Sequence, residues 1–273
     1  MSAFRAACVQ LRSSDDVAQN IEIASSLIRE AHASGAEFIA TPENTTLMAP
    51  DGGAKLDRSF SEDADPALPA FRALAEELGA WLLIGSLAIK VSAGKTANRS
   101  FLIDAKGRIA ARYDKIHLFD TDPGSGESYR ESNTVEGGHR AVTADLPWGR
   151  LGMTICYDLR FARLYRRLAQ AGAMVLSVPS AFTQTTGKAH WHVLLRARAI
   201  ENGAFVIAPA QGGVHANGRQ TYGHSLIVAP WGEILAEAGT EPGVIVADID
   251  VAAAISARSR VPSLSHDREF EGP

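Results

Sequence analysis

The sequence predicts one α/β domain, because apolar strands alternate with amphipathic helices from end to end of the 273-residue chain. Hydrophobic residues make up 46% of the chain, which is enough for one large core. No linker, internal repeat or low-complexity tract divides it. We therefore expect a single domain over residues 1–273, with a C-terminal tail from about residue 259. Periodicity alone leaves open whether its sheets are open, closed or packed on one another.

The first half of the chain combines strands with two helices. Apolar residues at helical spacing between Ile21 and Ala31 predict a helix that ends at Gly35, and a second helix begins at Pro66 and ends at Gly79. Between residues 51 and 65 we expect a polar, Gly-rich loop, and between 120 and 138 a longer loop of a kind that is commonly functional. Strands are predicted at 4–11, 37–43, 81–90, 97–104 and 109–119.

The second half continues the alternation. Phe161, Leu164 and Leu168 share one face of a predicted helix, and residues 188–202 form another. The chain beyond Arg258 shows no clear element. Strands are predicted at 140–146, 150–156, 173–179, 204–211, 222–230, 234–238 and 244–249.

Composition and charge exclude several classes of protein. A formal net charge of -4 and a pI of about 6.1 argue against a nucleic-acid binder, which usually carries a concentrated basic patch. The N-terminal residues do not resemble a signal peptide, and no apolar run approaches the length of a membrane span. We expect a cytoplasmic protein in which both cysteines, Cys8 and Cys156, are free thiols.

Cys156 is the candidate nucleophile. It ends an apolar strand and directly precedes a helical segment that starts near Asp158. At a sharp strand-to-helix turn, backbone N–H groups and the helix dipole surround the side chain, and both favour the thiolate over the thiol. The alternative is a buried structural cysteine, which is the role we expect for Cys8 in the middle of its strand.

Charged residues elsewhere could support such a nucleophile. Glu43 closes the strand at 37–43, where burial would raise its pKa toward that of a general base for a thiol; otherwise it is a solvated loop acid. Lys115 ends a strand-like run, where its ammonium would stabilise an oxyanion; otherwise it is one more exposed lysine. His117 can also be interpreted as a base for Cys156, or as a residue that contacts the catalytic residues without taking part in the reaction.

The long loop contains two acids, Glu127 and Glu131. One buried lysine can serve two glutamates, because each charge offsets another. From the residues alone, however, both acids would be interpreted as surface charges.

Taken together, these segments resemble the nitrilase superfamily of carbon–nitrogen hydrolases. The resemblance runs from Phe4 to beyond His266 and implies a four-layer α-β-β-α sandwich that forms homodimers or larger homo-oligomers. The motifs that carry it, in the family's order, are Thr41-Pro42-Glu43-Asn44, Asp114-Lys115-Ile116-His117-Leu118-Phe119-Asp120, Glu131-Ser132 and Thr154-Ile155-Cys156-Tyr157-Asp158-Leu159-Arg160-Phe161.

The resemblance implies catalysis by Glu43, Lys115 and Cys156. Glu131 is preferred to Glu127 as the second glutamate, because Glu131-Ser132 reproduces the Glu-Ser pair of the family. In the implied mechanism Glu43 is the base, Cys156 forms a thioester, and Lys115 holds the oxyanion together with a backbone N–H. No metal or organic cofactor is required.

Within the superfamily the chain resembles the Nit branch, through segments at 180–183, 186–191, 195–201, 222–225 and 230–233. Members of that branch hydrolyse small amides that bear carboxylates. Deaminated glutathione is the expected substrate, because Lys188 stands where omega-amidases tend to have proline. The alternative is an omega-amidase that acts on α-ketoglutaramate.

Four residues are expected to bind the substrate: Arg160, Tyr157 through its backbone N–H, Phe182 and Thr186. Arg160 could grip a carboxylate from the start of the helix after the nucleophile, or it could form an ion pair with Asp158 or Glu201. Phe182 and Thr186 fit a pocket wall and a hydroxyl donor, or simple packing of a loop.

Two other classes of function stay open. One is a catalytically silent binding protein with this fold, which the complete set of Glu43, Lys115, Glu131 and Cys156 disfavours. The other is a redox sensor based on Cys156, which lacks a resolving cysteine nearby in the sequence.

Overall fold

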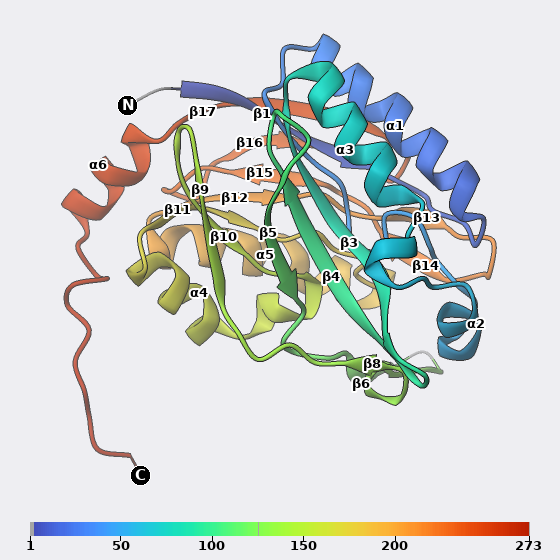
Figure 1. The fold of residues 1–273 in the computed structure, drawn as a ribbon. Helices are drawn as coiled ribbons and strands as arrows, with labels where there is room; N and C mark the ends of the chain where they lie inside the picture. The colour runs from blue at the N-terminus through green and yellow to red at the C-terminus, as the bar shows by residue number, and fades with distance from the viewer. Residues whose placement is uncertain (1–2, 125, 273) are drawn as a thin grey trace.

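In the computed structural model, which describes residues 3–124 and 126–272, two mixed sheets lie face to face with helices on both outer sides (Figure 1). This arrangement confirms the expected four-layer α-β-β-α sandwich. The first sheet has the order β17(Gly243–Asp250), β1(Ala3–Gln10), β2(Phe38–Ala40), β3(Trp81–Ser92), β4(Lys95–Ile103), β5(Ile109–Asp114), and β8(Val135–Glu136) pairs with β4. The second has the order β16(Ile234–Glu237), β15(Leu226–Val228), β12(Phe205–Ala208), β11(Ala173–Ser177), β10(Gly149–Met153), β9(Val142–Leu146).

Each sheet is built around three parallel strands whose crossovers contain helices, as parallel pairing requires. In the first sheet these crossovers contain α1(Val17–Ala33), α2(Gly52–Asp57), η1(Glu62–Ala64) and α3(Ala67–Leu78). In the second they contain α4(Ala162–Gln170), which follows the 3₁₀ helix η3(Cys156–Arg160), and α5(Gln184–Asn202). Two hairpins, β6(Asp120–Gly124) with β7(Glu127–Arg130) and β13(Gly212–Val214) with β14(Gln220–Tyr222), η2(Glu131–Asn133) and α6(Ala252–Arg260) complete the fold.

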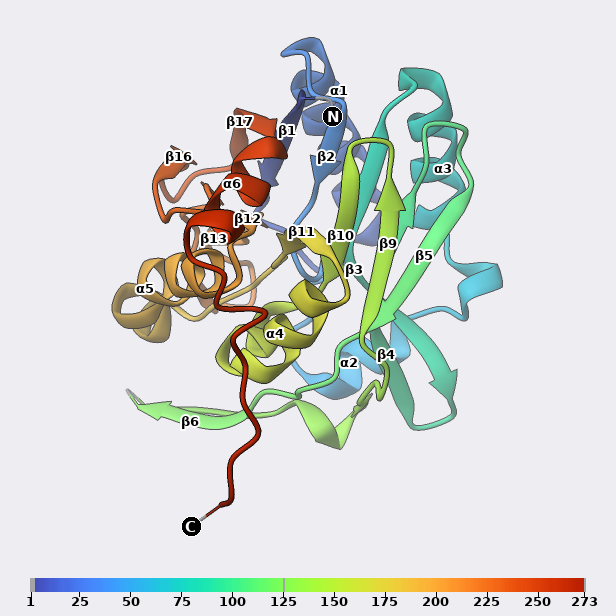
Figure 2. The same cartoon turned by 90° about the vertical axis from the view of Figure 1, so that its left-hand side faces the viewer.

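Alternation along β1 divides the apolar residues between two cores. Ala6 and Cys8 face the second sheet, whereas Ala7 and Val9 pack against the α1 and α3 side. Figure 2 shows the two helical layers on opposite sides of the stacked sheets, with the C-terminal tail extending away from the body.

Several predicted strands end earlier than the sequence suggested. β2 ends at Ala40, β5 at Asp114 and β10 at Met153, because the residues that follow leave the sheets and turn toward a common cavity. The chain was predicted to have no element beyond Arg258, which is correct only past Arg260. The helix α6, which ends at Arg260, was missed. Its alanine-rich sequence has no side-chain cap and only a weak apolar stripe, so the usual helix signals are absent. Among the described residues, no helix combines the length and the apolar character needed to cross a membrane.

Candidate active site

Three of the predicted site residues meet where the chain leaves β2, β5 and β10. Glu43, Lys115 and Cys156 line one cavity of about 480 Å³, which is formed by the loops that follow these strands together with α2, β7 and the start of α5. Ligand pockets typically have volumes of about 300–1,000 Å³, so a small molecule fits. The carboxyl ends of parallel strands meet at one edge of a sheet, which explains how residues far apart in the sequence converge here.

A bulge in β3 supports the loop that carries Glu43. The pairing of β3 with β4 shifts between Ile84 and Leu87, and Ser86 accepts the backbone N–H of Asn44 at 2.9 Å through its hydroxyl. Gly85 is required there, because a Cβ would lie 2.1 Å from the carbonyl oxygen of Thr41. The loop can therefore approach β3 closely, and Glu43 is aimed into the cavity.

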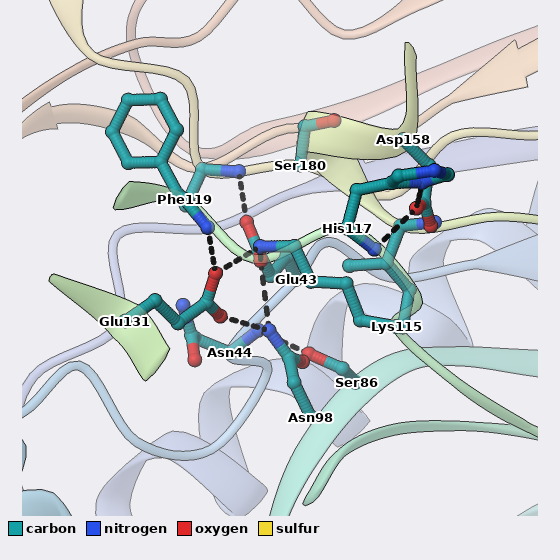
Figure 3. Close-up of polar contacts among 12 residues, drawn as sticks. Glu43, Asn44, Ser86, Asn98, Lys115, His117, Phe119, Glu131, Asp158 and Ser180 are labelled. Atoms are coloured by element: carbon teal, nitrogen blue, oxygen red, sulfur yellow. Dashed lines mark hydrogen bonds and ion pairs between the residues drawn. The ribbon is translucent and has the colours of Figure 1, made fainter. Parts of the chain in front are cut away.

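The Glu43 carboxylate is buried and fully engaged (Figure 3). Its Oε1 accepts from Lys115 Nζ at 2.8 Å and from Asn98 Nδ2 at 2.9 Å, and its Oε2 accepts the backbone N–H of Ala181 at 2.9 Å. Burial would raise the pKa of Glu43, but the ammonium of Lys115 outweighs it and lowers that pKa to about 2. The predicted effect of burial is thus present, but the expectation that the pKa of Glu43 is raised overall is wrong.

Lys115 lies between two carboxylates. Its Nζ donates to Glu43 at 2.8 Å and to Glu131 Oε2 at 2.9 Å, with 2% of its side chain exposed. Burial alone would lower the pKa of Lys115, yet the two glutamates raise it well above its usual value. The ammonium is thus permanently charged and fixed beside the cavity.

Cys156 occupies a strained turn at the start of η3. Its φ is +49°, in the left-handed region that non-glycine residues rarely adopt, and its N–H donates to the carbonyl oxygen of Pro179 at 2.9 Å. The thiol and the carboxylate of Glu43 line the same cavity, and the two groups influence each other's pKa. Burial first, and then the charge of Glu43, raise the pKa of the thiol. The prediction that this position favours the thiolate is therefore wrong for the free protein, although the strand-to-helix turn is present.

Of the two loop acids, Glu131 contacts the central lysine and Glu127 does not. Glu131 Oε2 accepts the backbone N–H of Phe119 at 2.7 Å as well as Lys115 Nζ, and its Oε1 accepts Asn98 Nδ2 at 3.1 Å. Glu127 lines the same cavity but is hydrogen-bonded to the hydroxyl of Tyr129 at 3.2 Å.

Sequence reasoning missed two residues that organise this cluster. Asn98, on β4, donates to both Glu43 and Glu131 and so fixes their separation. Asp158 is completely buried and accepts hydrogen bonds from Tyr113, His117 and Ile155. A polar residue at an inward-facing strand position was the available signal for Asn98, whereas Asp158 was considered only as a partner for arginine.

The expected substrate-binding residues divide into two groups. Tyr157, Phe182 and Thr186 line the cavity. Arg160 is not among the lining residues: its Nη1 lies 3.2 Å from His190 Nδ1, and its guanidinium lies over the rings of Tyr157 and Phe182.

The two ion pairs considered for Arg160 are also missing from the described part of the chain. Asp158 is hydrogen-bonded to Tyr113 and His117, and Glu201 pairs with Arg198 at 2.8 Å. His117, the alternative base, is hydrogen-bonded to Asp158 through Nδ1 at 2.7 Å and stacks on Phe161.

A second polar cluster lies outside the cavity. His192, His224 and Glu237 place potential metal-ligand atoms within 4.8 Å of one another. Glu237 Oε1, however, is already hydrogen-bonded to both imidazoles at 2.9 Å, so these side chains satisfy one another.

The sequence matches the family model described as carbon–nitrogen hydrolase over residues 5–259. It is 42% identical over 270 residues to the deaminated glutathione amidase of Synechocystis sp. (strain PCC 6803 / GT-S), with 97% of this chain and 98% of that protein covered. Omega-amidase NIT2 of Homo sapiens is 35% identical over 268 residues, with 98% and 96% covered. The crystal structure of the C. elegans NitFhit protein is similar with a TM-score of 0.92 at 36% identity, over 98% of this chain and 66% of that one.

Proposed function

The chain belongs to the carbon–nitrogen hydrolase family and is an amide hydrolase, and we propose that it cleaves a small, carboxylate-bearing amide through a thioester on Cys156. The observation that carries the proposal is the convergence of Glu43, Lys115 and Cys156 on one cavity, with Lys115 Nζ 2.8 Å from the carboxylate of Glu43. A nucleophile, a base and a fixed positive charge are the parts that acyl transfer needs.

The first half of the reaction acylates the enzyme. As the sulfur of Cys156 attacks the amide carbonyl, its proton passes to Glu43 and the carbonyl π electrons move onto oxygen. Lys115 Nζ and the backbone N–H of Tyr157 donate to that oxyanion; Tyr157 is the second residue of η3, so its N–H has no acceptor within the helix. Glu43 then returns the proton to the leaving nitrogen as the C–N bond breaks.

The second half hydrolyses the thioester. Glu43 takes a proton from water as the water oxygen attacks the thioester carbonyl. When the tetrahedral intermediate collapses, the C–S bond breaks and the proton returns from Glu43 to sulfur. Glu131 keeps Lys115 in place through both halves, and it does so without contacting the reacting atoms.

Deaminated glutathione is the substrate we propose, with α-ketoglutaramate as the second candidate, because proteins named for both activities are similar along almost their whole length. In both molecules the acyl group carries a carboxylate at the end opposite the scissile carbonyl. Release of cysteinylglycine from the first, measured beside release of ammonia from the second, distinguishes them as a ratio of kcat/KM values.

The decisive test of the mechanism is Cys156→Ala. We expect no turnover of either amide by a variant whose circular dichroism spectrum and Tm match those of the wild type. Cys156→Ser should also be inactive, because the hydroxyl is a far weaker nucleophile at this position. Hydrolysis at the wild-type rate by pure, folded Cys156→Ala would overturn the proposal, and Cys8→Ala serves as the matched thiol control.

We also propose that the chain forms a homodimer through the outer face of α5. Val193 and Ile200 lie seven residues apart on that face, with 68% and 54% of their surfaces exposed. Trp231, in the turn before β16, is also exposed, at 46%. Sedimentation of the wild type as a dimer, and of Val193→Lys as a monomer, would support this interface.

A further inference from the structure

Lys55, on the short helix α2, reaches the same cavity as Cys156. Its side chain is half-buried, and its Nζ donates to Asn44 Oδ1 at 2.7 Å. Asn44 is itself fixed, because its N–H is bound by Ser86. An ammonium has three donors. Within residues 3–124 and 126–272, no carboxylate lies within ion-pair distance of Lys55, so two donors have no charged acceptor.

The other cations that line the cavity are engaged. Lys115 is held by two glutamates, and Arg130 pairs with Asp122 at 2.8 Å. Arg219 donates to the carbonyl oxygen of Ala181 at 2.9 Å, and its guanidinium lies 5.1 Å from the centre of the Tyr129 ring. Its Nε is buried and has no partner among the described residues.

Lys55 and Arg219 repel each other across the cavity wall. Burial lowers the pKa of Lys55. The negative charges of Glu131 and Glu43 oppose this effect, the positive charges of Lys115 and Arg219 add to it, and the pKa stays below its ordinary value. A charged group without a direct counter-ion in such a place is unfavourable. An anion bound between Lys55 and Arg219 would remove this penalty and would use the free donors of both.

We propose that Lys55, assisted by Arg219, binds the carboxylate at the far end of the substrate's acyl group. This inference rests on the proposed function and names the residue that selects a carboxylate-bearing amide. It differs from the expectation from the sequence, in which Arg160 held the carboxylate, because Arg160 does not line the cavity while Lys55 and Arg219 do. Arg160 instead supports the wall through the rings of Tyr157 and Phe182.

The test compares two amides of the same length, α-ketoglutaramate and pentanamide, of which only the first has a carboxylate. For Lys55→Met we expect kcat/KM for α-ketoglutaramate to fall about 100-fold, mainly through KM, while that for pentanamide changes less than about threefold. Lys55→Arg should recover part of the lost kcat/KM, since it restores the charge with a different geometry. Lys106→Met, which removes a lysine from an exposed turn, is the matched control.

Binding without turnover separates this proposal from the proposed function. In the Cys156→Ala background, calorimetry with α-ketoglutarate should give a Kd that rises at least tenfold on adding Lys55→Met and stays unchanged on adding Lys106→Met. An unchanged Kd would overturn the assignment of Lys55. An equal loss of kcat/KM for both amides in Lys55→Met would also overturn it, because Lys55 would then act on Glu43 and Glu131. A loss confined to α-ketoglutaramate in Arg160→Gln, and absent from Lys55→Met, would overturn it as well. A wild type that hydrolyses neither deaminated glutathione nor α-ketoglutaramate would defeat the proposed function, whereas the comparison of Kd values would still test Lys55.

Discussion

Asp158 joins the two segments that carry Lys115 and Cys156, and Asp158→Asn should therefore weaken both folding and catalysis. Its carboxylate is completely buried and accepts four hydrogen bonds. Oδ1 is bound to the backbone N–H of His117 at 3.1 Å and to His117 Nδ1 at 2.7 Å, the contact drawn in Figure 3. Oδ2 is bound to the hydroxyl of Tyr113 at 2.6 Å and to the N–H of Ile155 at 2.9 Å.

The size of the effect follows from this count. An asparagine keeps one accepting oxygen and presents an NH₂ group in place of the other, so two of the four donors lose their acceptor. A hydrogen bond to a charged acceptor contributes about 1.5–3 kcal/mol, which gives a loss of about 3–6 kcal/mol in the free energy of unfolding. Total stabilities are about 5–15 kcal/mol, so the loss is large. A displacement of about 1 Å between Lys115 and Cys156 would lower kcat by about 100-fold.

Urea unfolding and steady-state hydrolysis of α-ketoglutaramate measure the two effects. Asp145→Asn is the control, because that carboxylate pairs with Arg150 on the surface and is 74% exposed, so its loss should change stability by less than about 1 kcal/mol. If Asp158→Asn does not fold, Tyr113→Phe removes one of the four hydrogen bonds to Asp158, together with the long one from the N–H of Ile116 at 3.4 Å, and should still show about half the loss. The reasoning would be refuted if the free energy of unfolding of Asp158→Asn lay within about 1 kcal/mol of the wild-type value and its kcat within about threefold.

Two further predictions concern the protons of the site. The pKa of Cys156 is raised above 9.0, the ordinary value of a thiol. The ultraviolet absorbance of its thiolate, measured as the difference between wild type and Cys156→Ala, should therefore not rise as the pH passes 9.0. A rise below that pH would contradict the assigned position of the proton. The folded-state pKa of Glu43 lies below its ordinary value of 4.5, so its stabilisation is complete above pH 4.5 and is lost as the pH falls toward about 2. Wild type should lose up to about 3 kcal/mol more than Glu43→Gln over that window in denaturant titrations, and parallel curves would contradict the prediction.

The strand and helix pattern was enough to predict the α/β class and most elements. Alternation in β1 and the apolar stripe of α1 are local properties, so they can be read within a window of ten to twenty residues. Sheet order was not predictable in the same way, since β17 pairs with β1 across almost the whole chain. The four-layer arrangement came from the resemblance, and the structure agrees with it.

The site was predictable where a motif carried it and not elsewhere. Glu43, Lys115, Glu131 and Cys156 were expected in one place, and they line one cavity. Lys55 lies in a segment interpreted as a polar loop, where a lysine is unremarkable by sequence alone. Whether a cation has a partner is a property of three-dimensional neighbours, so the sequence could not show that Lys55 lines the cavity whereas Arg160 does not.

The protonation states of Glu43 and Cys156 could not have been derived from their own segments. Lys115, 72 residues from Glu43, stabilises the carboxylate directly, whereas Cys156 is buried beside that negative charge. The proton therefore rests on sulfur in the free protein, and in the proposed mechanism it passes to Glu43 as the sulfur attacks a carbonyl whose oxyanion Lys115 binds. Oxidants and alkylating agents attack the thiolate and not the thiol. A cysteine that ionises only during the reaction is therefore protected from both reagents while no substrate is bound. Burial and the negative charge of Glu43 thus keep the proton on the Cys156 sulfur in the free protein, and in the proposed mechanism the same carboxylate accepts that proton during attack on the amide.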